Sequence, residues 1–236
     1  MFHFKQFDIE DNGATMKVGT DAVLLASVCA KNHNTNTSNI RILDIGTGCG
    51  IVALIMAQKF KNAIVDAIDI DVRSIELASR NFVSSPWSVR LNALQCSLQD
   101  YTANDAYEII VSNPPYFHNS LKNTTTRKTL ARHDDNLPLD SLFSKVKQLM
   151  AEEGSFTMIY PQQHAEEPVK YAEQNGLYLN GKTNIMDNSK SRLKLSVMTF
   201  KNTAIRYTER DLVLHAPSGI YTEEYRQLVS DLYLWA

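Results

Sequence analysis

Short apolar runs alternate with longer amphipathic or apolar segments through most of the chain. An apolar run of roughly four to eight residues between turn signals is typical of a buried strand, and helical spacing over a longer stretch is typical of a helix. The first half of this pattern predicts a helix over 20–30 with Thr20 as its cap, and a helix over 71–82 capped by Asp71. Between and after them we expect strands over 41–46, 63–70, 89–96 and 107–113, and a helix over 50–60.

The second half continues the alternation before it changes. It predicts a helix over 141–153 that Gly154 ends, a strand over 154–161, a helix that ends near Asn175 and Gly176, strands over 177–187 and 193–200, and a closing helix over 221–235. Alternating strands and helices indicate an α/β fold, an open and mostly parallel sheet with helices on both faces. Such sheets bind ligands at the carboxyl ends of their strands, so the motifs that follow the strands are the candidates for a binding site.

Composition narrows the class of protein. The 236 residues carry a formal net charge of -2, with 44% hydrophobic and 21% charged residues, which excludes disorder, collagen and coiled coil as overall descriptions and also a strongly basic nucleic-acid coat. We expect a single domain over 1–236, with an N-terminal helical extension over 1–40, a core over 41–161 and C-terminal strands and a helix over 162–236. Three widely spaced cysteines, no signal peptide and no apolar run long enough for a membrane span predict a cytoplasmic protein without membrane contact.

A glycine-rich turn follows the first expected strand. Asp44 is followed by Gly46, Thr47, Gly48 and Gly50, a spacing that lacks the third glycine of the dinucleotide fingerprint and the lysine of a Walker loop. Glycines let a backbone turn tightly and approach a ligand, and the turn leads into a helix N-terminus that favours an anion. Asp69 ends the second strand, where a carboxylate can accept the hydroxyls of a ribose. The plain alternative is a tight turn, but the two signals together favour a ligand that carries a ribose.

These two segments, LDIGTGCG at 43–50 and AIDID at 67–71, resemble the first two motifs of the class I S-adenosylmethionine-dependent methyltransferases. The resemblance implies a Rossmann-like, mostly parallel seven-stranded sheet with an antiparallel last strand, and S-adenosyl-L-methionine as cofactor without a metal. In that family an acidic residue after the third strand often binds the cofactor adenine, but Ser97 and Leu98 stand there in this chain, with Asp100 shortly after. The expected cofactor-binding residues are Lys17, Thr20, Asp44, Gly46, Thr47, Gly48, Gly50, Asp69, Ile70, Ser97, Leu98 and Asn113.

The segment EIIVSNPPYF at 108–117 follows the fourth expected strand. Two prolines make a rigid turn, so the Asn113 amide and the Pro114 carbonyl are both presented at the sheet edge, with the Tyr116 ring beside them. The segment resembles the (D/N/S)-P-P-(Y/F/W) motif of methyltransferases that act on amino groups conjugated to a planar π-system. The resemblance makes Asn113, Pro114 and Tyr116 the catalytic candidates: two acceptors for the amine N–H groups, and a ring that stacks on a base.

The motif alone leaves adenine N6, guanine N2 and a glutamine amide open. Together with NPPYF, the segments at 12–27, 129–142 and 220–234 resemble the bacterial tRNA adenine N6-methyltransferases that modify the purine beside the anticodon of a valine tRNA. This resemblance implies tRNA as the substrate and N6-methyladenosine as the product. The sequence itself gives no sign of an obligate protein partner. Alternatives are a protein glutamine N5-methyltransferase, an rRNA guanine N2-methyltransferase, a DNA adenine methyltransferase, and a catalytically inactive RNA-binding module. The short stretch before the first strand, the modest length and the intact motifs disfavour the first, third and fourth of these.

Basic residues gather in two segments, 118–133 and 182–210, in spite of the negative total charge. Both segments are expected near the carboxyl edge of the sheet or its flank, where they can meet phosphates, although charge runs are commonly solvated faces. The expected RNA-binding residues are Lys122, Arg127, Lys128, Arg132, His133, Lys190, Arg192 and Lys194.

Overall fold

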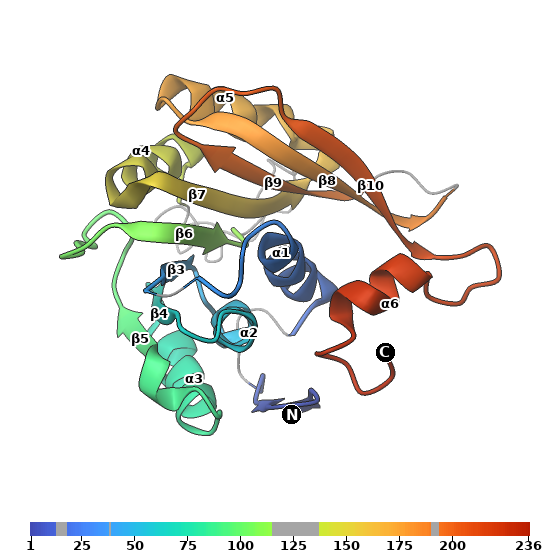
Figure 1. Ribbon diagram of the computed structural model, residues 1–236. Helices are drawn as coiled ribbons and strands as arrows, with labels where there is room; N and C mark the ends of the chain where they lie inside the picture. Colours follow the sequence, from blue (N-terminus) through green and yellow to red (C-terminus); the bar gives the residue numbers. More distant parts are fainter. Residues whose placement is uncertain (13–17, 38, 115–136, 190–193) are drawn as a thin grey trace, which may run out of the picture.

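The computed structural model describes residues 1–12, 18–37, 39–114, 137–189 and 194–236. Its strands are β1 (Phe2–His3), β2 (Asp8–Ile9), β3 (Arg41–Ile45), β4 (Ile64–Asp69), β5 (Leu91–Gln95), β6 (Tyr107–Ser112), β7 (Met150–Pro161), β8 (Tyr178–Asn188), β9 (Leu195–Lys201) and β10 (Thr208–His215). Strands β3 to β10 form one eight-stranded sheet in the order β10-β8-β9-β7-β6-β3-β4-β5, and β1 and β2 pair with each other near the N-terminus (Figure 1).

Helices cover both faces of this sheet. The described helices are α1 (Thr20–Lys31), α2 (Ile51–Lys59), α3 (Val72–Val83), α4 (Leu139–Leu149), α5 (Glu166–Gln174) and α6 (Glu223–Val229), with short 3₁₀ helices at Ser88–Arg90 and Gln162–His164. The apolar sides of α1, α2, α3 and α6 share one buried cluster with one face of the sheet. Helices α4 and α5 share a second cluster with the opposite face, as their position in Figure 1 also shows. The expected α/β class with helices on both faces is confirmed.

The strand directions agree with the prediction in all but one respect. Within the series β7-β6-β3-β4-β5 each pair of adjacent strands is parallel, whereas β9 is antiparallel to both β7 and β8. The antiparallel strand is therefore the seventh strand of the sheet in chain order, as expected. The number seven is wrong, because β10 adds an eighth strand parallel to β8. The first four residues of β10, Thr208–Asp211, are polar, so the hydrophobic pattern gave no sign of a strand there.

Two of the expected helix boundaries are also wrong. Helix α4 ends at Leu149 and not near Gly154, because residues 150–153 already belong to β7. Gly154 lies inside that strand beside a shift in register against β6, and a Cβ there would come within 2.9 Å of the Tyr107 carbonyl oxygen. A glycine at such an irregularity permits close approach of two backbones. The closing helix α6 ends at Val229, well before residue 235.

The expected caps give one confirmation and one correction. Asp71 caps α3, since its carboxylate accepts hydrogen bonds from the backbone N–H groups of Arg73 and Ser74. Thr20 does not cap α1: it is the first helical residue, and the N-cap is Gly19, which has no side chain to accept a bond. The cap prediction for Thr20 failed because glycine also suits an N-cap and its extended backbone.

The two ends of the chain pack against each other. The backbone N–H of Lys5 donates to the Leu232 carbonyl at 2.8 Å, and the Phe4 ring stacks on Tyr233 with 5.5 Å between the ring centroids. The N-terminal hairpin is therefore part of the same buried cluster as α6. In the portion that the structure describes, no helix is long and apolar enough to cross a membrane.

Candidate active site

The predicted motifs meet at the carboxyl edge of the central strands. Strand β3 lies between β4 and β6, and Ile45 at its end is paired with Ile68 of β4 and Ser112 of β6. The residues that follow, Gly46 and Asn113, therefore leave the sheet side by side, next to Asp69 at the end of β4. The chain order reverses between β3 and β6, which makes this edge the topological switch point at which α/β sheets bind ligands.

The glycine turn has the backbone conformation that its sequence requires. Gly46, Gly48 and Gly50 have φ values of 72°, 56° and 86°, in the left-handed region that favours glycine. A Cβ on Gly46 or Gly48 would meet nothing within 4 Å, whereas a Cβ on Gly50 would lie 2.5 Å from the Phe82 ring. Gly50 is thus needed for packing on α3, and the other two glycines leave open space at the surface of the turn.

Asp44 lies beneath the turn and stabilises it. Its Oδ2 atom accepts hydrogen bonds from Thr47 Oγ1 at 2.6 Å and from the backbone N–H of Ala53 at 3.2 Å, in the first turn of α2. Asp44 is almost fully buried, and burial raises the pKa of its carboxyl group to about 7, although both hydrogen bonds favour the charged form. One carboxylate therefore joins the end of β3, the turn and the N-terminus of α2.

Asp69 approaches the turn from the neighbouring strand. Its Oδ2 accepts from the backbone N–H of Gly48 at 2.9 Å, and its Oδ1 accepts from the N–H of Asp71 at 2.9 Å. Desolvation by burial raises the pKa of Asp69 above its ordinary value, against these bonds. The capping role belongs to Asp71, so Asp69 is not needed as a helix cap. Its side chain lies at the strand end and is partly exposed.

The edge on either side of Asp69 carries the remaining candidates. Ser112 Oγ donates to the Ile45 carbonyl at 3.0 Å and joins β6 to β3 directly before Asn113, which is half-buried, and Pro114, which is buried. After β5, Ser97 Oγ donates to Asp100 Oδ2 at 2.6 Å, and the Asp100 N–H returns a bond to Ser97 Oγ at 3.2 Å.

The other expected cofactor-binding residues differ in exposure. Ile70 follows Asp69 with 54% of its side chain exposed, whereas Leu98 is buried in the cluster under α4 and α5. Thr20 is exposed at the start of α1. Lys17 and Tyr116 lie outside the described residues.

One expected RNA-binding residue can be placed. Lys194 is exposed just before β9, and its carbonyl accepts from the backbone N–H of Gln162, which follows β7. Because β9 is antiparallel to β7, Lys194 lies at the same edge of the sheet as the glycine turn. The other seven lie outside the described residues: Lys122, Arg127, Lys128, Arg132, His133, Lys190 and Arg192.

Asn81 of α3 is a contact of the glycine turn that the sequence motifs did not reveal. Its side chain donates to the carbonyl of Cys49 at 2.8 Å. The available signal was its place on the buried side of α3, with Leu77, Ala78 and Phe82. A polar residue on an apolar helix face calls for a partner.

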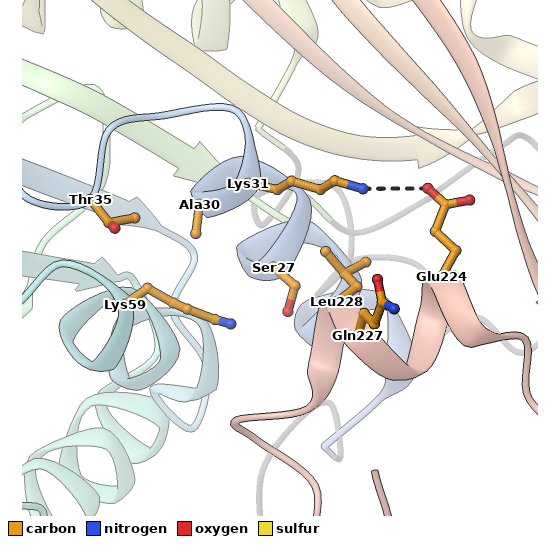
Figure 2. A pocket seen from close by; sticks show the side chains of 8 residues that line it. All are labelled: Ser27, Ala30, Lys31, Thr35, Lys59, Glu224, Gln227 and Leu228. Carbon is orange, nitrogen blue, oxygen red and sulfur yellow. Dashed lines mark hydrogen bonds and ion pairs between the residues drawn. The ribbon is translucent and has the colours of Figure 1, made fainter.

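Two further features bear on what the site can contain. In the described ranges, no three or more His, Cys, Asp or Glu side chains are grouped so that they could bind a metal ion. A separate hollow lies between α1, the end of α2 and α6, lined by Lys31, Lys59 and Glu224 among others (Figure 2). It is at the opposite end of α2 from the glycine turn. Its two lysines are ion-paired, Lys31 with Glu224 at 3.4 Å and Lys59 with Asp231 at 2.5 Å.

Comparison with known proteins agrees with this geometry. Residues 15–169 match the model of the methyltransferase small domain family. A relative from Pedobacter heparinus named tRNA1(Val) (adenine(37)-N6)-methyltransferase is 38% identical over 99% of this chain and 97% of its own. A protein of the same name from Phocaeicola vulgatus is 37% identical over 99% of this chain and 97% of its own.

Solved structures share the fold at low sequence identity. A predicted O-methyltransferase from Agrobacterium tumefaciens matches 89% of this chain and 96% of its own with a TM-score of 0.66 and 20% identity. A glycopeptide N-methyltransferase solved with S-adenosyl-L-methionine matches 78% of this chain and 95% of its own, with a TM-score of 0.58 and 10% identity. The chain belongs to the methyltransferase small domain family and, within it, to the family of the tRNA1(Val) (adenine(37)-N6)-methyltransferases, and is therefore a methyltransferase.

Proposed function

We propose that this protein transfers a methyl group from S-adenosyl-L-methionine to the exocyclic N6 of an adenine in tRNA, at position 37 beside the anticodon of a valine tRNA. The observation that carries the proposal is the position of Asn113 and Pro114 beside the glycine turn at the switch point. The names of relatives that match nearly the whole chain support the choice of adenine and of tRNA.

The residues of the turn fit the cofactor. The open space over Gly46 and Gly48 admits a chain of atoms against the backbone, and the partly exposed Asp69 carboxylate can accept the two ribose hydroxyls. When bound, S-adenosyl-L-methionine supplies an electrophilic methyl group on a sulfonium, and transfer of that methyl group leaves S-adenosyl-L-homocysteine as the product. We assign the turn to the methionine part, together with Lys17 and Thr20, and Asp69 to the ribose, with Ile70 beside it.

The cofactor adenine requires a different partner from the acidic residue that the family often uses. We assign its amino group to the hydrogen-bonded pair of Ser97 and Asp100, because the pair presents hydroxyl and carboxylate oxygens after β5. Leu98, which follows Ser97, is buried, and we assign it to the apolar floor of this subsite. The Asp100 carboxylate thus supplies an acceptor next to Ser97. The residue type at position 97 does not by itself reveal this acceptor.

The turn after β6 acts on the target amine. The Asn113 Oδ1 and the Pro114 carbonyl accept the two N–H groups of an exocyclic amine and favour a pyramidal nitrogen with a localised lone pair. The nitrogen becomes more acidic as it attacks, so both hydrogen bonds strengthen in the transition state. The product nitrogen then loses its proton without a strong general base, and neither a metal nor a protein partner is part of the proposal.

The target base must leave its stack to reach this edge, and we assign Tyr116 to stack on it. Lys194 and the seven basic residues outside the described ranges are assigned to the tRNA backbone, where contacts to phosphate position the substrate. A single domain over 1–236 in the cytoplasm is consistent with an enzyme that acts on tRNA.

The test uses the full chain and S-adenosyl-L-methionine with a labelled methyl group. Separate reactions contain unmodified tRNA, DNA, rRNA and protein, and the labelled pool is digested and its products are separated. We expect N6-methyladenosine from the tRNA pool, at the nucleotide beside the anticodon. Label that appears only as methylglutamine or as N2-methylguanosine would overturn the adenine assignment, and no transfer to any pool would overturn the proposed activity.

A further inference from the structure

The side chain of Asn81 has an unusual set of partners. It is 4% exposed on α3, and its Nδ2 donates to the carbonyl of Glu10 at 2.9 Å and to the carbonyl of Cys49 at 2.8 Å. Its Oδ1 accepts from the backbone N–H of Glu10 at 2.8 Å. Both amide hydrogens are therefore used, and the side chain pairs with Glu10 as a neighbouring strand would.

One of these partners belongs to the glycine turn. Cys49 lies between Gly48 and Gly50, which both have a positive φ. The Gly48 N–H is bonded to Asp69 at the same time. The turn is thus held on two sides. Its Gly48 N–H donates to Asp69, and its Cys49 carbonyl accepts from Asn81. The next residue of α3, Phe82, packs its ring against Gly50.

The other partner is the N-terminal segment. Glu10 directly follows β2, and Asn81 binds both of its backbone groups. The Glu10 side chain makes a separate contact, at 3.4 Å from Arg80 at the surface. The β1–β2 hairpin is therefore joined to the glycine turn through a single buried amide, although residues 10 and 49 are far apart in the sequence.

We propose that Asn81 is a positioning residue for the cofactor turn, and that it couples the N-terminal segment to cofactor binding. Its two N–H groups keep the Cys49 carbonyl and the Glu10 backbone in place. The turn then keeps the shape in which Gly48 and Asp69 face the cofactor. The inference rests on the proposed function, since it takes the turn to be the cofactor site.

The test compares two variants with the wild-type protein. Asn81→Asp keeps the size of the side chain but replaces the NH₂ group, which donates to the carbonyls of Glu10 and Cys49, with an oxygen that can only accept. Asn81→Ala removes all three hydrogen bonds. If one such bond holds the turn in its binding conformation, the free energy needed to restore that conformation on binding lowers the affinity by roughly tenfold. We expect calorimetry to show at least about tenfold weaker binding of S-adenosylhomocysteine in both variants. In the methylation assay the KM for the cofactor rises, while kcat at saturating cofactor changes little.

Two control variants separate positioning from general destabilisation. Glu10→Ala removes the contact with Arg80 but keeps the backbone groups that Asn81 binds, so its affinity for S-adenosylhomocysteine should equal that of the wild type. Asn92→Ala removes a bond of 2.8 Å to Asp66 near the start of the neighbouring strands. Its melting temperature should fall while its affinity stays unchanged.

A measurement on the wild-type protein keeps the test independent of how the variants fold. Coupling between two sites is reciprocal, so S-adenosylhomocysteine should slow hydrogen exchange at the Glu10 amide. The Ala63 amide, bonded to Phe60 at 3.1 Å at the other end of α2, serves as the reference. Saturating ligand that leaves Glu10 exchange unchanged, or a folded Asn81→Asp variant that binds as tightly as the wild type, overturns the inference. A wild-type protein that binds no S-adenosylhomocysteine overturns the proposed function instead.

Discussion

The buried carboxyl group of Asp44 makes the stability of the cofactor turn depend on pH. Its pKa is about 7 in the folded protein, against an ordinary value of 3.8, because burial disfavours the charged form. A difference of about 3 pKa units corresponds to roughly 4 kcal/mol. A carboxyl group whose pKa is raised on folding contributes its full stability below the unfolded pKa and loses it as the pH rises to the folded pKa. The contribution of Asp44 should therefore fall between about pH 4 and pH 7 and then stay level.

Asp44→Asn tests this, because the amide keeps the size of the side chain and an oxygen for Thr47 and Ala53 but does not titrate. The free energy of unfolding is measured by urea denaturation at a series of pH values for both proteins. The wild-type value minus the variant value should decrease by roughly 4 kcal/mol from pH 4 to pH 7. Taking this difference cancels groups that both proteins share.

Asp66 provides a control of the opposite sign. Although burial alone would raise it, hydrogen bonds from Tyr107, Asn92 and Arg41 bring the pKa of Asp66 below its ordinary value. The stability that Asp66 contributes is therefore lost as the pH falls, and the wild-type minus Asp66→Asn difference should rise with pH. A wild-type minus Asp44→Asn difference that stays flat or rises with pH would refute the assignment of a raised pKa to Asp44.

Three further predictions concern catalysis and binding. Asn113→Ala should lower kcat by roughly 100-fold or more, because it removes an acceptor whose hydrogen bond strengthens in the transition state. Calorimetry should show nearly unchanged cofactor affinity, and a loss of that affinity would instead make Asn113 a cofactor ligand. Gly48→Ala should abolish most cofactor binding. Gly219 also has a positive φ, 81°, and open space around it, so Gly219→Ala should lower the free energy of unfolding by roughly 1–2 kcal/mol without affecting cofactor binding. Equal losses of cofactor binding in the two variants would contradict a cofactor role for Gly48. The affinity for tRNA should fall with salt by a slope of about 0.7–0.9 per phosphate contact in a double logarithmic plot, and a flat plot would contradict backbone contacts by the basic segments.

The elements with the strongest hydrophobic pattern were the most predictable. The glycine turn, Asp69 and the strands around them form a local α/β pattern, in which the sequence order of the motifs also determines their position at one edge of the sheet. The pattern does not predict strand β10, because its first four residues are polar. It does not predict the β1–β2 hairpin either, because each of its strands is only two residues long and its packing depends on the distant C-terminal segment. The sequence predicts helix at the start of β7, since the glutamates at 152 and 153 favour helix, but the pairing of β7 with β6 decides the structure.

The chemistry of the candidate site was only partly visible in the sequence. The residue types of Asp44, Asp69 and Asn113 indicate their roles, because each lies at or near the carboxyl end of a parallel strand and these ends meet at one edge of the sheet. The partnership of Ser97 with Asp100 and the contacts of Asn81 depend on exact side-chain geometry, which no spacing rule supplies. A buried asparagine on an amphipathic helix was the one signal in the sequence that pointed to such a contact.

Strand β10 has a consequence for the behaviour of the protein at high concentration. It is one of the two edge strands of the sheet, and an edge strand can offer backbone groups to another chain, the usual starting point of edge-to-edge aggregation. In its second half Thr222 already binds the carbonyls of Val213 and Leu214, so its first half is the part that matters here. Its first half carries Glu209, Arg210 and Asp211 in succession, so charged side chains point to both faces of the edge. A second copy aligned along this edge would have to desolvate these charges, including the ion pair between Glu209 and Lys182 at 3.2 Å. The polar stretch that hides this strand from the hydrophobic pattern thus also protects this edge of the sheet against self-association.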